Sequence, residues 1–372
     1  MPIRRIPRRR TTRFATARND AARVTTTRAI TTRIGAPAAP AAATRRAALL
    51  AAAASVALLA GCAAPAASTT AAEDTGPAAA SGFPLTIDNC GTEVTFESAP
   101  ERVVTIKSST LELLLALGLE DRIIGTAFSD GPVPDEFADA ASGLEVLSEK
   151  VPSQEATLAA EPDLVYAGWE SNLTAEGAGD RDTLAKLGVA SYVAPAACKG
   201  EGYMPNPLTF DEVFREFEEA GAIFGVPDAA ADLVATQRAA LDAVDPSDAA
   251  LTALWYSSGD DTPFVGAGIG APQMIMSAAG LGNIAADVED TWTSMGWEAI
   301  VAANPDVIVL VDAAWNTAEH KIEQLESNPA TAAMPAVQQQ RYLVVDFPAT
   351  EAGVRNVDAV TSLVEQLEEL GL

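Results

Sequence analysis

Glu155 to Tyr166 reads EATLAAEPDLVY, and Glu298 to Val309 reads EAIVAANPDVIV, so the chain carries nearly the same stretch twice, 143 residues apart. Six of the twelve positions are identical. In each copy a Glu opens an amphipathic helix, Pro-Asp ends it, and an apolar run follows, LVYAGW after Asp163 and VIVLVDAAW after Asp306. A continuous apolar strand that follows a helix is typical of a parallel sheet covered on both faces. The repeat therefore predicts two α/β lobes of similar plan.

The other apolar runs fit the same plan. The patterns predict strands in ERVVTI (101–106), DRIIGTA (121–127), LTALWYSSG (251–259) and TPFVGAGIG (262–270), and helices in STLELLLALGL (109–119) and Pro272–Ala279. A helical pattern from Leu208 to Val244, broken near Gly225-Val226-Pro227, joins the halves once. We expect an N-terminal lobe over 83–206, a connecting helix over 207–245 and a C-terminal lobe over 246–372. The predicted fold is two α/β lobes with parallel sheets, joined by one long α-helix, with a ligand cleft between the lobes at the carboxyl ends of the strands.

The first 61 residues have the character of a targeting segment. They hold 12 of the 24 Lys and Arg residues, and Asp20 is their only acid. Arg45 and Arg46 precede the apolar run ALLAAAASVALLAG, which ends in Leu-Ala-Gly-Cys at Cys62. This pattern predicts a secretory signal over 1–61, lipidation of Cys62 and a flexible tether over 62–82. An ordinary helix with a buried Cys is the alternative, and the length before Arg45 leaves open a start site downstream of Met1.

The rest of the chain is strongly acidic. From Cys62 onward 50 acidic residues face 12 basic ones, which argues against nucleic acid as a partner. A location outside the cytoplasm, on the outer face of the cell membrane, favours a disulfide between Cys90 and Cys198. Since His320 is the only histidine, a His/Cys metal or haem ligand set is excluded, and we expect no resident metal or cofactor.

The sequence resembles a known family, the substrate-binding proteins of ABC importers for iron-siderophores and cobalamin. The resemblance covers residues 83–372. It is carried, in order, by PERVV (100–104), LALG (115–118), the first repeat copy, KLGV (186–189), the second copy, MPAV (334–337) and YLVVD (342–346). Within the family, WYSSGDDTPFVGAGIGAPQM (255–274) and YAGWESN (166–172) are most similar to an actinobacterial branch assigned to a precursor of the deazaflavin coenzyme F-420.

The resemblance gives the repeat a function. In that family one Glu on each lobe, seven residues before the Pro of Pro-Asp, docks on arginines of the permease, and Glu155 and Glu298 occupy these places. The implied partner is a dimeric permease with its cytoplasmic ATPase, since two carboxylates suit a two-fold symmetric partner. The alternative is structural, because the helix dipole favours a Glu in a first helical turn in any protein.

Ligand-binding residues are expected where the predicted strands end. Tryptophans in these loops predict an aromatic ligand, with Trp169 and Trp292 facing each other across the cleft, and bases in so acidic a chain predict an anionic one. Each type has a structural alternative, since tryptophans pack in cores and lysines are usually solvated. The candidates are Lys107, Ser108, Lys150, Trp169, Glu170, Tyr256, Trp292, Trp315 and Arg355.

The predicted function is therefore that of an extracytoplasmic lipoprotein that captures an anionic, aromatic small molecule and delivers it to an ABC permease. The ligand classes are a deazaflavin precursor, an iron-siderophore or a cobalamin-type molecule. The alternative is a secreted carboxylate-dependent hydrolase, because 50 acids allow many carboxylate pairs. We expect no enzyme, since the sequence has neither a GxSxG nor an HExxH motif.

Overall fold

A computed structural model describes residues 82–372. The expected signal segment and the predicted lipidation site at Cys62 lie outside these residues. Between residues 82 and 372, no helix combines the length and the apolar character needed to cross a membrane.

The N-terminal lobe is built on a parallel sheet, as predicted. Its strand order is β5-β4-β3-β6-β7, and every neighbouring pair is parallel. An antiparallel hairpin, β1–β2, precedes it. The elements are β1 (Leu85–Asn89), β2 (Thr92–Phe96), β3 (Val103–Ile106), α1 (Ser108–Ala116), β4 (Ile123–Ala127), α2 (Ala138–Ala141), β5 (Val146–Ser148), α3 (Gln154–Ala159), β6 (Leu164–Ala167), α4 (Arg181–Lys186) and β7 (Ala190–Val193).

The C-terminal lobe has a mixed sheet, which corrects the expectation of two parallel sheets. Its order is β11-β9-β8-β12-β13, with β10 beside β8. Strands β8, β12 and β13 are parallel, whereas β9 and β11 run antiparallel to their neighbours. The elements are β8 (Thr252–Ser258), β9 (Phe264–Gly266), α7 (Ala271–Ala278), β10 (Gly282–Asn283), β11 (Trp292–Ser294), α8 (Trp297–Ala303), β12 (Val307–Asp312), α9 (Ala318–Ser327), α10 (Pro335–Gln338), β13 (Tyr342–Asp346) and α11 (Asn356–Glu369).

Two helices, and not one long helix, connect the lobes. They are α5 (Phe210–Ile223) and α6 (Pro227–Asp242), and they separate where the sequence predicted a break. Gly225 takes a φ of 67°, a left-handed conformation that glycine adopts without strain, and Pro227 starts the second helix. The helices pack closely because Gly221 leaves room for Ala230, whose side chain would lie 2.4 Å from a Cβ at that position.

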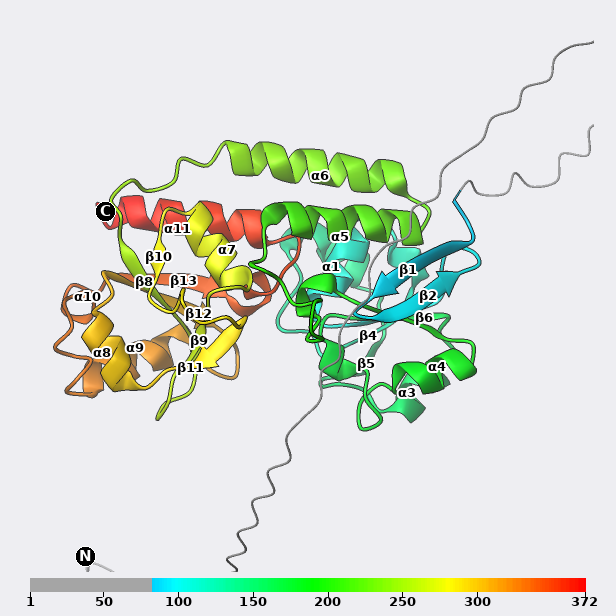
Figure 1. The fold of residues 1–372 in the computed structure, drawn as a ribbon, viewed down its shortest axis with the longest axis horizontal. Coiled ribbons are helices and arrows are strands. Elements are labelled where there is room, and N and C mark those ends of the chain that lie inside the picture. The colour runs from blue at the N-terminus through cyan, green and yellow to red at the C-terminus, as the bar shows by residue number, and fades with distance from the viewer. Residues whose placement is uncertain (1–81) are drawn as a thin grey trace, which may run out of the picture. The chain divides into compact units, whose positions relative to one another are not determined.

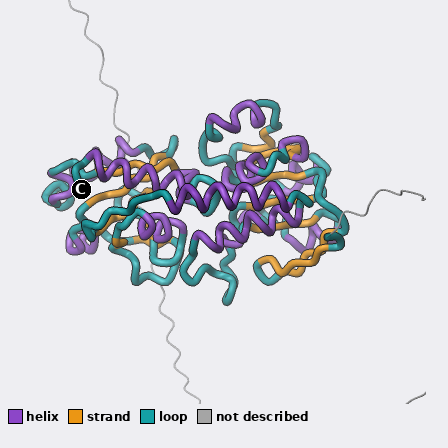
Figure 2. The backbone as a smooth tube through the Cα atoms, turned by 90° about the horizontal axis from the view of Figure 1, so that it is seen from above, coloured by secondary structure: helices purple, strands orange, loops and turns teal. Residues whose placement is uncertain are grey.

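The two lobes share one apolar core. A single buried cluster includes residues of α1 and α5 beside residues of α7 and α11, so it continues from one sheet to the other. Each lobe has a second, separate cluster on the opposite face of its sheet. Figure 1 shows α5, α6 and α11 along the upper side of the molecule, and Figure 2, seen from above, shows helices lying across the strands of both lobes. The two lobes are therefore packed against each other through a continuous apolar core.

The repeated Pro-Asp has a structural role in both lobes. Asp163 accepts hydrogen bonds from the backbone N–H groups of Glu101 and Arg102, at 2.8 and 3.0 Å, just before β3. Asp306 accepts the backbone N–H of Thr252 at 2.8 Å, at the start of β8. In each copy the aspartate thus joins the amino end of its own strand to that of the neighbouring parallel strand. The Asp of each repeat copy is therefore explained by its hydrogen bonds between neighbouring strands.

Candidate functional site

A cavity of about 630 Å³ lies between the lobes. Most of its wall residues lie at or after the carboxyl ends of β3, β6 and β7 in one lobe and of β8, β12 and β13 in the other, which is the expected edge of both sheets. Phe264 of β9 and residues 290–292, which lead into β11, complete the wall of the second lobe. Among the candidate residues, Trp169, Glu170, Trp292 and Trp315 line it. The other aromatic and charged lining residues are Lys199, Phe264, Asp290, Phe347 and Glu351.

Trp169 is held from three directions. The ammonium group of Lys107 lies 3.7 Å from the centroid of its ring, and Phe128 packs edge-on at 5.5 Å. Its indole N–H donates to Glu351 of the other lobe at 2.9 Å. Burial raises the pKa of Glu351, and the charge of Lys107 acts in the opposite direction. One aromatic side chain therefore both faces the cavity and bridges the two lobes.

Trp292 is positioned by the glycine-rich run from Gly266 to Gly270. Backbone N–H groups of this run donate to the carbonyl groups of Val288, Asp290 and Thr291 at 3.0–3.2 Å. A Cβ on Gly268 would lie 2.1 Å from a backbone oxygen, so only glycine allows this approach. The ring of Trp292 stacks on Phe264, with centroids 5.8 Å apart and planes at 13°. The glycine-rich run thus makes a close backbone contact with the segment that leads into Trp292.

Trp315 is the most exposed of the three tryptophans, with 62% of its surface accessible. It packs edge-on against Phe347 at 5.7 Å. The buried ammonium group of Lys321 donates to the carbonyls of Val311 and Asn316, both at 2.6 Å, and so fixes the loop that carries the ring. Burial lowers the pKa of Lys321 to about 8. This role of Lys321 could not be read from the sequence, because the residue lies in a helix rich in charged residues.

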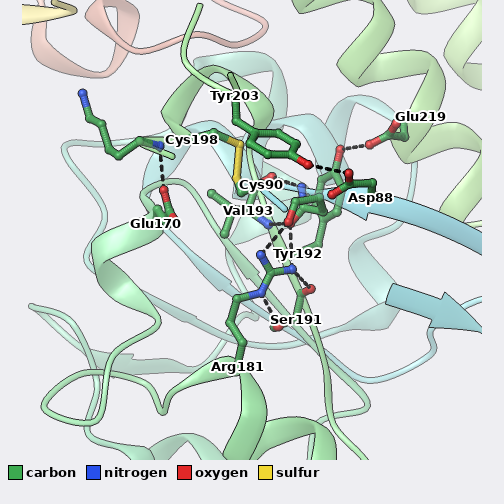
Figure 3. The surroundings of a disulfide bond; sticks show 12 residues. Asp88, Cys90, Glu170, Arg181, Ser191, Tyr192, Val193, Cys198, Tyr203 and Glu219 are labelled. Carbon is green, nitrogen blue, oxygen red and sulfur yellow. Dashed lines mark hydrogen bonds between the residues drawn. A yellow bond between two sulfur atoms is a disulfide. The ribbon is translucent and has the colours of Figure 1, made fainter. Parts of the chain in front are cut away.

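A disulfide supports the rim formed by Lys199. Cys90 and Cys198 are joined, as expected, and Figure 3 shows their surroundings. The next residue, Lys199, donates its backbone N–H to Glu170 at 2.6 Å. Its ammonium group donates to Thr291 of the other lobe at 2.7 Å and lies 3.5 Å from Asp290. The disulfide is therefore next to a residue that lines the cavity and contacts the other lobe.

Five predicted ligand residues do not line the cavity. Lys107 is fully buried and forms an ion pair with Asp130, so its charge is already neutralised. Ser108 is buried and accepts the backbone N–H of Asp130. Tyr256 is buried, and its hydroxyl donates to the carbonyl of Gly259 at 3.0 Å.

The last two of these residues are bases. Arg355 forms an ion pair across the lobes with Glu112, at 2.5 and 2.7 Å, and Lys150 is exposed away from the cavity. Among the described residues, Lys199 is the only Lys or Arg that lines the cavity. None of the three basic residues predicted to bind the ligand, Lys107, Lys150 and Arg355, lines the cavity. The expectation of an anionic ligand therefore loses its support.

Glu155 and Glu298 lie in corresponding places on the two lobes. Each is exposed in the first turn of its helix, α3 or α8. Figure 1 shows both helices on the side of the molecule away from α6. Neither residue lines the cavity.

Comparison with known sequences places this architecture in a family. Residues 103–349 match the periplasmic binding protein family. A cobalamin-binding protein of Halobacterium salinarum is 32% identical over 246 residues, covering 62% of this chain and 59% of that protein, so the match spans less than two thirds of that relative. An uncharacterised ABC transporter substrate-binding lipoprotein of Bacillus subtilis, YvrC, is 27% identical, over 77% of this chain and 86% of its own length.

A solved structure agrees with this assignment. The chain is similar to an ABC-type Fe³⁺-hydroxamate transport protein of Saccharomonospora viridis, with a TM-score of 0.67 and 27% identity, over 77% of this chain and 99% of that one. The overall fold therefore has a counterpart among solved structures, and the sequence matches the family over residues 103–349. The chain belongs to the periplasmic binding protein family.

Proposed function

We propose that this chain is the substrate-binding component of an ABC importer, which captures a small organic ligand between its lobes outside the cytoplasm. The observation that carries the proposal is the cavity between the lobes, with one or more tryptophans from each side. Its volume of about 630 Å³ lies within the range of small-molecule sites. The family members named above are binding proteins or transport components, which favours binding over the hydrolase alternative.

The ligand classes follow from the relatives and from the aromatic lining. The names of the relatives include a cobalamin-binding protein and a ferric hydroxamate transport protein. A corrin ring, an iron-siderophore or a deazaflavin precursor of coenzyme F-420 each offers a flat or apolar surface for Trp169, Trp292 and Trp315. These three classes are the candidates that we propose for the substrate.

Glu155 and Glu298 are the proposed docking residues for a dimeric permease with its cytoplasmic ATPase. Reversing both to Lys should reduce co-purification with the permease complex about tenfold or more, because like charges then meet the permease arginines. Ligand binding, followed by tryptophan fluorescence, should be unchanged, since neither residue lines the cavity. The matched control reverses two exposed acids on other helices, Asp182 and Glu218. Equal loss in the control, or no loss in the variant, would rule out this docking pair.

Cys62 is the proposed lipid anchor. It ends the stretch Leu59-Ala60-Gly61-Cys62, which follows an apolar run. Replacing Cys62 with Ser should release the protein from the membrane fraction and change its mass, because no lipid is attached. A variant that stays in the membrane fraction at the wild-type mass would contradict the anchor.

A further inference from the structure

The charged lining of the cavity is predominantly acidic. Glu170, Asp290 and Glu351 line it, whereas Lys199 is the one basic lining residue in the part of the chain that the structure describes. Lys199 is already engaged, because its ammonium group contacts Thr291 at 2.7 Å and Asp290 at 3.5 Å. An anionic ligand would therefore find no free cation on the cavity wall.

The buried Lys107 next to the cavity does not add a free positive charge to the acidic lining. Lys107 lies beneath Trp169, but Asp130 forms an ion pair with it. Burial acts to raise the pKa of Asp290, yet the backbone N–H of Thr291 and the charge of Lys199 lower it overall, so this carboxylate is ionised at neutral pH. The whole chain also carries a formal charge of −27, so long-range electrostatics repel anions as well.

The apolar part of the lining suits flat ring systems. Trp292 and Phe264 form a stacked pair, and Trp315 and Phe347 form an edge-on pair. Trp169 completes the lining from the other lobe. The carboxylate groups of Glu351 and Glu170 accept hydrogen bonds from protein groups, and carboxylates accept further ones readily. Flat surfaces and acceptors together recognise a ring with donor groups around its edge.

We infer that the cavity selects flat ring ligands that have no net negative charge and that present hydrogen-bond donors, and that it discriminates against polyanions. This inference rests on the proposed binding function and names its substrate class. Amide-bearing macrocycles and uncharged fused rings belong to this class, and ligands with free carboxylates or phosphates do not. The discrimination arises from like-charge repulsion in a partly desolvated site, where such repulsion is weakly screened.

Matched ligand pairs test the charge separately from the shape. The pairs are cyanocobalamin and its monocarboxylic acid, and riboflavin and its 5′-phosphate, titrated against the tryptophan fluorescence of the purified protein. In each pair that binds, the uncharged member should bind roughly tenfold or more tightly than the anionic one. The D290N/E351Q variant should narrow this ratio several-fold, whereas the exposed control D182N should leave it unchanged.

The outcomes separate the inference from the function. If the anionic member binds as well as its uncharged partner, or if the ratio is unaffected in D290N/E351Q, the inference is wrong and the binding function stands. If no member of any pair changes the fluorescence, the proposed function fails for corrin and flavin ligands, and the inference fails with it.

Discussion

Replacing Arg355 with Met is expected to lower the free energy of unfolding by about 3 kcal/mol, because it leaves Glu112 buried without its cation. The side chain of Glu112 is 2% exposed and that of Arg355 is 15% exposed, and the pair joins α1 of one lobe to the start of α11 of the other. Arg355 also donates to the carbonyl of Pro132 at 2.7 Å. Urea denaturation of the purified variant measures the loss.

The pH dependence of this loss identifies its cause. Burial raises the pKa of Glu112, while Arg355 acts to lower it. Without the arginine, Glu112 is protonated more easily, so the deficit of the variant should shrink as the pH falls. The control is Arg215→Met, whose exposed partner is Glu212 and which should cost about 0.5 kcal/mol or less. A fully stable Arg355→Met protein that has lost only ligand affinity would restore Arg355 as a ligand residue.

Replacing Glu216 with Gln is expected to stabilise the protein by about 2 kcal/mol at pH 8, and by little at pH 5. Glu216 lies on α5 and is buried against the N-terminal sheet, where one oxygen accepts the hydroxyl of Tyr166 at 2.9 Å. Its other oxygen has no hydrogen-bond partner among the described residues. Burial raises the pKa of Glu216 from 4.5 to about 8.

Glu216→Gln is expected to stabilise the protein because Glu216 binds a proton in the folded state at pH values where the unfolded chain has released it. Between pH 4.5 and about 8 the folded protein keeps a proton on Glu216 that the unfolded chain releases. The stability linked to this group is therefore complete below pH 4.5 and is lost as the pH rises to about 8. Glutamine is neutral at every pH and has no such loss. Denaturation curves at several pH values measure the difference, with the exposed Glu218→Gln as control. A difference independent of pH would contradict the burial of a titrating group.

The sequence predicted the lobes because their signals are local. Apolar runs flanked by Pro and Gly marked β3, β6, β8 and β12, and the repeat indicated that the two lobes share a plan. The antiparallel strands β9 and β11 were not predicted as such, since three residues carry no strand pattern that reveals direction. The split of the connecting helix was visible in the sequence at Gly225-Val226-Pro227, although its consequence for packing was not.

The cavity was predicted in position but not in charge. Trp169, Trp292 and Trp315 follow strand or loop ends, and this placement can be read along the chain. The pairing of Lys107 with Asp130, 23 residues away, and of Arg355 with Glu112, 243 residues away, depends on the tertiary fold. A lysine in a strand-end loop looks the same in the sequence whether it meets a ligand or a buried carboxylate. For this reason the ligand charge could not be predicted from the number of bases.

The hydrogen bonds of Asp163 and Asp306 bear on how accurately the cavity is built. In each lobe they hold two neighbouring strands at their amino ends, where residues far apart in the chain meet. A slip of one residue between parallel strands would exchange the inward and outward faces of the slipped strand. It would also move the loop at the opposite end of that strand by one residue length. The spacing of Trp169 and Trp315, which follow β6 and β12, is therefore set by contacts at the edge of the sheet farthest from the cavity.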